Sequence, residues 1–106
     1  MTTEYIELKA NLPILKFECS SNAKAVILIT IKDHLYDLTS IPRCVEHIKF
    51  DYFFNQIIRQ DDLPAELKSI VFGTHFNQPI DVNVLPAGLQ SIQFGHYFNQ
   101  EKYITN

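Results

Sequence analysis

Apolar residues recur along this chain with a period of 22 positions. Residues 41–62, 63–84 and 85–106 follow one another without a spacer, and the last two, LPAELKSIVFGTHFNQPIDVNV and LPAGLQSIQFGHYFNQEKYITN, are nearly the same text. When each segment is numbered from 1, positions 1, 5, 8, 10 and 14 are apolar in all three copies, whereas positions 3, 6 and 9 vary. The apolar positions are the predicted core, because a unit of this length buries its apolar side only against its neighbours.

Positions 7 to 10 of each copy alternate between variable and apolar residues, which is typical of a strand with one buried face. One short strand per repeat is expected, near residues 46–50, 68–72 and 90–94, all stacked in parallel. Gly73 and Gly95 end their strands at position 11, where the backbone needs either a positive φ or a close approach. Asp51 takes that position in the first copy and is expected to tolerate left-handed backbone.

The triplet Phe-Asn-Gln recurs at positions 14 to 16 of every copy. Its phenylalanine is predicted to fill the interior, and its asparagine to be buried and to hydrogen-bond loop groups of its own and the adjacent repeat. Because the triplet occurs in each repeat, it indicates structure rather than catalysis or metal binding. The residues assigned to this structural ladder are Phe54, Asn55, Phe76, Asn77, Phe98 and Asn99.

Upstream of residue 41 the pattern weakens. Residues 19–40 form a degenerate repeat, with Ala23, Val26 and Leu28 at positions 5, 8 and 10. The run AVILITI at 25–31 is β-branched and would place apolar side chains on both faces of a strand. It therefore predicts a strand that is covered on both faces. Residues 1–18 alternate around an Asn-Leu-Pro turn and are expected to form a β-hairpin that caps the N-terminal end.

The pattern LPxxLxxIxFGxxFNQPI, as it stands at residues 63–80, closely resembles the FNIP repeat, a 22-residue relative of the leucine-rich repeat found in social amoebae and in giant viruses of amoebae. The resemblance covers residues 41–106, and 19–106 with the degenerate repeat. The third copy has Glu101 and Lys102 in place of Pro-Ile, and the first copy has Ile57 in place of the proline.

The resemblance implies a fold and a binding role, with no catalytic residues. The expected fold is mainly β: a single domain, residues 1–106, forming a short leucine-rich-repeat-like solenoid of parallel strands with an N-terminal hairpin cap. In giant viruses the repeats often follow an F-box, which would imply a ubiquitin-ligase adaptor. Here Leu12 and Pro13 are followed by a strand-and-turn pattern and not by an amphipathic helix, so this adaptor function lacks sequence support.

Composition excludes several classes of function. The net charge of −3 gives no basis for nucleic-acid binding, and no apolar run is long enough for a membrane helix. The N-terminus does not resemble a secretory signal. Cys19 and Cys44 stand at different repeat positions and are interpreted as free thiols in a reducing compartment. We therefore expect a cytoplasmic protein, in the host cytoplasm or the virion if it is viral.

No group of residues predicts catalysis or a cofactor. The four histidines lack the helical spacing of a zinc protease. His75 and His96 fall in adjacent repeats, but a zinc ion needs three or four ligands, so solvated loop positions are the better interpretation. The chain has no glycine-rich phosphate loop and no nucleophile elbow, and Asp61 and Asp62 sit at a turn between repeats. We predict no enzyme activity, no metal and no cofactor.

Two surfaces are candidates for binding a protein partner. Positions 7 and 9 face outward from the sheet, and positions 12 and 13 gather aromatic residues and histidine on one loop edge, as interface centres do. For Phe53, exposure and packing over the edge are equally compatible with the sequence, whereas Tyr97 is expected to be exposed. The predicted partner-binding residues are His47, Lys49, Val71 and Gln93 on the sheet, and Tyr52, Phe53, His75 and Tyr97 on the edge.

The leading interpretation is a noncatalytic protein-interaction module whose partner is unidentified. The alternative is a structural or assembly protein, such as a particle component, that self-associates through its solenoid ends. The last repeat carries an open strand edge near residues 91–94, which favours pairing with another chain. Under this alternative, the partner is a second copy of the chain, and the homo-oligomer forms through the C-terminal repeat.

Overall fold

The structure is a computed structural model that describes residues 5–9, 25–29 and 35–99. Its strands are β1 Tyr5–Lys9, β2 Ala25–Ile29, β3 His47–Phe50, β4 Ser69–Val71 and β5 Ser91–Gln93. Two short 3-10 helices, η1 Leu38–Ser40 and η2 Val82–Val84, follow β2 and β4. The described segments contain no α-helix.

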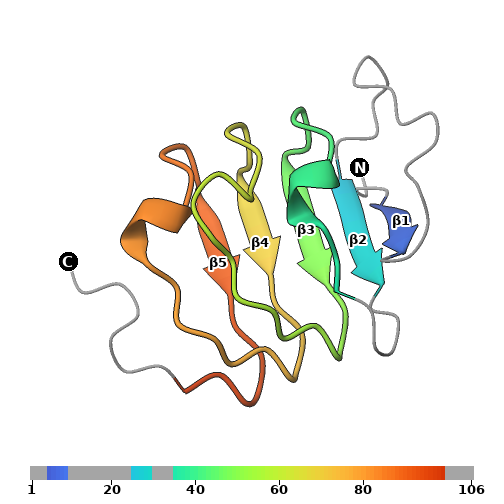
Figure 1. Ribbon diagram of the computed structural model, residues 1–106, viewed down its shortest axis with the longest axis vertical. Coiled ribbons are helices and arrows are strands. Elements are labelled where there is room, and N and C mark those ends of the chain that lie inside the picture. Colours follow the sequence, from blue (N-terminus) through green and yellow to red (C-terminus); the bar gives the residue numbers. More distant parts are fainter. Residues whose placement is uncertain (1–4, 10–24, 30–34, 100–106) are drawn as a thin grey trace.

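The five strands form one sheet in chain order, β1-β2-β3-β4-β5, with every neighbouring pair parallel (Figure 1). Ile48 pairs with Ile70, and Ile70 with Ile92, so corresponding residues of successive repeats lie side by side. The period of the sequence is therefore the period of the sheet. The parallel strands expected near residues 46–50, 68–72 and 90–94 are confirmed.

The core lies between the sheet and the chain segments that return from the end of one strand to the start of the next (Figure 1). Isoleucine at position 8 and phenylalanine at positions 10 and 14 point into this space and stack on their counterparts. Ring centroids are 5.0 Å apart for Phe50 and Phe72 and 5.5 Å apart for Phe72 and Phe94. Phe72 therefore contacts a ring in the repeat on either side, and the repeats share one continuous core.

The tight turn after each strand does not use left-handed backbone at position 11. No described glycine has a positive φ, and the one described non-glycine residue that does is Asp61, with φ 71°. A Cβ at Gly73 would instead collide with the backbone oxygen of Asp51. Close approach is thus the reason for glycine, and the expectation of left-handed backbone at Asp51 is wrong.

Asp51 stabilises its turn through its side chain. Its Oδ1 accepts hydrogen bonds from the backbone N–H groups of Phe53, at 3.2 Å, and Phe54, at 3.1 Å. This is the local bonding by which aspartate favours turns.

The N-terminal region is described in part. Val26 pairs with Ile48 and Leu28 with Phe50, which is the register expected for the degenerate repeat; Ala23 lies outside the described residues. Ala25 and Val26 are both buried although they point to opposite sides of β2, so both faces are covered there. The expected hairpin is not shown: β1 pairs in parallel with β2, and residues 10–18 lie outside the described residues.

The interpretation of the cysteines as free thiols is wrong for Cys44, which is disulfide-bonded. Cys19, the other cysteine of the chain, lies outside the described residues. The bonded state of Cys44 removes the argument for a reducing compartment, because that argument depended on unpaired thiols.

Candidate interaction surfaces

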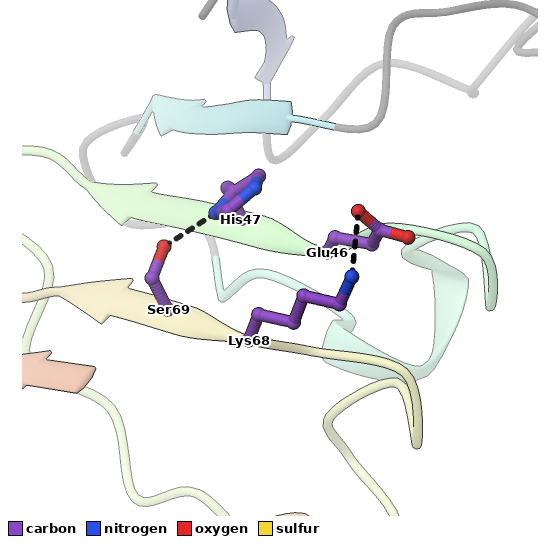
Figure 2. Close-up of polar contacts among 4 residues, drawn as sticks. All are labelled: Glu46, His47, Lys68 and Ser69. Atoms are coloured by element: carbon purple, nitrogen blue, oxygen red, sulfur yellow. Dashed lines mark hydrogen bonds and ion pairs between the residues drawn. The ribbon is translucent and has the colours of Figure 1, made fainter. Parts of the chain in front are cut away.

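The outer face of the sheet carries the residues at positions 7 and 9. In β3 and β4 the isoleucines and Phe50 are buried, while His47, Lys49, Ser69 and Val71 are partly exposed on the other face. Nδ1 of His47 lies 2.7 Å from Oγ of Ser69 on the next strand (Figure 2). The imidazole is thereby held along the sheet, and Gln93 is exposed at the end of this face.

An ion pair joins the same two repeats where the strands begin. Nζ of Lys68 lies 3.6 Å from Oε1 of Glu46 (Figure 2), and both side chains are partly exposed. Such a pair contributes about 0–1 kcal/mol. The two charges are opposite in sign and lie side by side, so this part of the sheet offers polar contacts but no net charge.

Five side chains from three successive repeats form a surface that we call the aromatic edge: Tyr52, Phe53, His75, His96 and Tyr97. Ring centroids are 4.9 Å apart for Tyr52 and Phe53, 4.7 Å for Tyr52 and His75, and 5.5 Å for His75 and Tyr97. Tyr52, Phe53 and Tyr97 remain 53%, 62% and 54% exposed. The rings therefore touch along one edge while their outer surfaces face solvent.

Backbone stacking of the turns places these rings in a row. The N–H of His75 donates to the carbonyl of Tyr52 at 3.0 Å, and the N–H of Tyr97 donates to the carbonyl of Thr74 at 3.1 Å. Nδ1 of His75 lies 3.1 Å from the same oxygen of Tyr52. A carbonyl oxygen only accepts, so this contact is a hydrogen bond in the tautomer that has the proton on Nδ1.

The asparagine side chains lie at the surface, which corrects the prediction that they are buried. Oδ1 of Asn55 accepts the backbone N–H of Asn77 at 2.8 Å, and Oδ1 of Asn77 accepts that of Asn99 at 3.0 Å. Asn55 and Asn77 thus each tie their own repeat to the following one. Of the phenylalanines that precede them, Phe54 and Phe76 are buried and Phe98 is partly exposed.

The structure also has two grooves that the sequence analysis missed. Both lie on the returning segments beside Ile57, each with a volume of about 530 Å³. Leu35, 81% exposed, borders one groove, and Pro79 borders the other. Position 17 of the repeat could have indicated these grooves. It is proline in the second copy, but Leu35 and Ile57 occupy it in the degenerate repeat and the first copy. Apolar residues at a variable position mark exposed apolar surface.

Tyr36 lines the groove that Leu35 borders, and its side chain is buried. Its hydroxyl has no hydrogen-bond partner among the described residues. Its backbone is held by Gln56, whose Oε1 accepts the Tyr36 N–H at 2.6 Å and whose Nε2 donates to the Tyr36 carbonyl at 2.9 Å. Desolvation by burial raises the pKa of Tyr36 to about 12.

The described residues do not assemble a metal centre: no three His, Cys, Asp or Glu side chains among them gather at one point. His75 and His96 each contact the ring of Tyr97, at centroid distances of 5.5 Å and 4.9 Å. None of the helices in the described segments has the length and apolar character needed to span a bilayer.

Comparison with known families agrees with the repeat geometry. The family model described as FNIP Repeat matches residues 37–75, 54–97 and 76–104. Neither the curated proteins nor the solved structures gave a match to this chain.

Proposed function

Because the chain belongs to the FNIP repeat family, we propose that it is a noncatalytic protein-interaction module built as a leucine-rich-repeat-like solenoid. The parallel register with the period of the sequence supports the solenoid. The absence of a clustered set of metal ligands in the described residues is compatible with a binding role. Repeat arrays of this kind present extended surfaces rather than enclosed reaction sites.

The aromatic edge is the proposed binding surface. Tyrosine and phenylalanine are enriched at the centres of protein interfaces, where a few large side chains provide most of the binding energy. Here Tyr52, Phe53 and Tyr97 already contact neighbouring rings, so a partner would immobilise little that is not already ordered. Contiguous exposed rings from successive repeats are the single observation that carries this proposal.

The outer face of the sheet is the weaker candidate. His47 is engaged by Ser69 and partly exposed, and the neighbouring ion pair uses Lys68 and Glu46. A partner docking there would displace or desolvate groups that already satisfy one another, which lowers the net gain.

The experiment compares two surface variants of the whole chain. Phe53→Ser with Tyr97→Ser changes the aromatic edge, and His47→Ala with Lys49→Ala changes the sheet face. Both pairs lie outside the buried core, and circular dichroism checks that both variants fold. Because FNIP repeats are abundant in amoebae and their viruses, the bait is applied to amoebal lysate, and each captured protein is purified and titrated by calorimetry.

We expect a protein that binds the wild type and the sheet-face variant alike but binds the edge variant at least about thirtyfold more weakly, which is the loss of one hot-spot contribution of about 2 kcal/mol. Binding that depends on the sheet-face pair and not on the edge pair would refute the aromatic edge as the site. The absence of any partner sensitive to either pair would refute the interaction module.

A further inference from the structure

The last described repeat presents an apolar surface that its predecessors cover. At position 8, Val26, Ile48 and Ile70 are buried, whereas Ile92 is partly exposed. The same difference separates Leu67 from its counterpart Leu89, and Leu85, Phe94 and Phe98 are likewise partly buried members of the core margin. The side of the core beyond β5 is therefore incompletely covered by the described residues.

The backbone of β5 is also open on that side. The N–H of Ser91 donates to Lys68 at 3.1 Å, and the carbonyl of Gln93 accepts from Phe72 at 2.8 Å, so both residues bond toward β4. Backbone groups alternate in direction along a strand, which places the N–H and C=O of Ile92 at the outer edge. No described strand pairs with that edge.

The described residues around β5 carry no charge, although Asp81 precedes this stretch and Glu101 and Lys102 follow it. Residues 82–100 contain no Asp, Glu, Lys or Arg, although the whole chain has 12 acidic residues and 9 Lys or Arg. Charged residues are the usual protection of an edge strand and are depleted in interface centres. The opposite edge differs, because the sequence of β1 includes Glu7 and Lys9.

We propose that two copies of this chain associate through β5, which pairs antiparallel with β5 of the second copy about a two-fold axis at Ile92. A two-fold interface requires a surface that complements itself. The described part of the β5 edge meets that condition, because it is uncharged and its outward N–H and C=O groups at Ile92 pair with no described strand. Pairing with the charged β1 edge of another copy would produce an open-ended array instead, and the charge difference between the edges disfavours it.

The arrangement predicts a defined register. Ile92 lies opposite Ile92 of the second copy, and the two residues exchange both N–H···O bonds as a hydrogen-bonded antiparallel pair. Ser91 then lies opposite Gln93 of the second copy. Since the axis is perpendicular to the sheet, the inner faces of both copies lie on the same side. The partly exposed leucine and phenylalanine residues of each copy are thus brought to a common apolar layer.

The register gives a test with matched variants, made in the full chain so that residues 100–106 are included. Ser91→Glu with Gln93→Glu places like charges opposite one another across the axis. Ser91→Lys with Gln93→Glu places opposite charges there. Both positions are exposed on β5, so the two variants perturb the fold of one copy similarly, and circular dichroism verifies this. Sedimentation equilibrium from micromolar to submillimolar concentration measures the dissociation constant of the dimer.

We expect a wild-type dimer, a dissociation constant raised roughly tenfold or more in the like-charge variant, and one near the wild-type value in the opposite-charge variant. A wild-type chain that stays monomeric over the whole range would overturn the proposal. Equal weakening in both variants, or no weakening in either, would also overturn it, because the dimer would then use another register or another surface. The aromatic-edge variant provides the link to the proposed function, since it should dimerise normally whether or not it binds a partner.

Discussion

Phenylalanine rings at positions 10 and 14 stack on their counterparts in neighbouring repeats. Phe76 is fully buried and stacks on Phe72 at a centroid distance of 4.0 Å, on Phe54 at 6.0 Å and on Phe98 at 5.9 Å. A side chain so surrounded leaves a cavity when it is truncated, because its neighbours relax only in part.

Phe76→Ala should therefore lower the free energy of unfolding by about 3–5 kcal/mol, which is a large part of the stability of a small domain. Urea denaturation followed by circular dichroism measures the change. Phe53→Ala is the matched control, since that ring is 62% exposed, and it should change stability by less than about 1 kcal/mol. Similar losses in the two variants would contradict the assignment of position 14 to the core.

Asn77→Ala tests the asparagine ladder. The substitution removes the oxygen that accepts the Asn99 N–H, but the site is exposed and water can replace that acceptor. We expect a loss of about 0.5–1.5 kcal/mol in thermal or urea denaturation, below the cost of leaving a buried amide unpaired. Full stability in this variant would show that the ladder does not hold the repeats together.

Tyr36 predicts a dependence of stability on alkaline pH. Its pKa is raised from 10.0 to about 12 in the folded protein. Below pH 10 the hydroxyl is protonated in both states and contributes no pH dependence. Between pH 10 and 12 the unfolded chain releases this proton and the folded chain keeps it, so stability falls as the pH rises.

Comparison of Tyr36→Phe with the wild type isolates this contribution. From pH 9 to 12 the wild type should lose about 2–3 kcal/mol more than the variant in the free energy of unfolding. At pH 7 the two proteins should differ little in stability, because the deleted hydroxyl makes no hydrogen bond of normal geometry among the described residues, although the Ser40 side chain lies near it. Parallel pH curves for the two proteins would contradict the burial of the hydroxyl.

At the scale of the elements, the turn after each strand depends on how closely two backbones approach. A Cβ at Gly95 would collide with the backbone oxygen of Gly73, whereas a Cβ at Gly88 would meet nothing. Gly95→Ala should therefore destabilise the protein, by about 1–3 kcal/mol as for an overpacked site. Gly88→Ala should be neutral or slightly stabilising, because alanine restricts the unfolded chain. Thermal denaturation of the two variants decides the matter, and equal melting temperatures would refute close packing of the turns.

The strands β2 to β5 and their order could be predicted because repetition within one chain separates constrained positions from free ones, whereas the parallel pairing of β1 could not. Apolar positions 8 and 10 specified the inward face of β3, β4 and β5, and the shared period specified a parallel register. The sequence alone does not show whether Gly73 is needed for a positive φ or for the close approach of two backbones, because it does not reveal how far apart those backbones lie.

The candidate surfaces were predictable to a smaller extent. Positions 12 and 13 were expected on a loop edge, but contact between the rings of neighbouring repeats depends on side-chain orientation. Asn77 was expected to be buried because asparagine occurs at this position in every copy. A surface side chain that hydrogen-bonds the backbone of a neighbouring repeat is restricted to the same residue type just as strongly. The state of Cys44 depends on which segments meet in three dimensions, and a spacing of two cysteines does not determine that.

At the scale of the molecule, the repeats bring different residues to different sides. The sheet face is polar, the aromatic edge is aromatic and exposed, and the described residues around β5 carry no charge. Since each repeat contacts mainly its neighbours, these sides vary independently while positions 8, 10 and 14 maintain the stack. Partner binding at the edge and association through β5 are therefore compatible in one molecule.

Ring-to-ring nuclear Overhauser effects report on the stacking of successive repeats. With selectively labelled phenylalanine, we expect cross-peaks between Phe50 and Phe72 and between Phe72 and Phe94, whose centroids lie 5.0 Å and 5.5 Å apart. We expect none between Phe50 and Phe94, which are separated by a whole repeat. A folded protein whose spectra lack the first two cross-peaks would contradict the stacked arrangement and the surfaces derived from it.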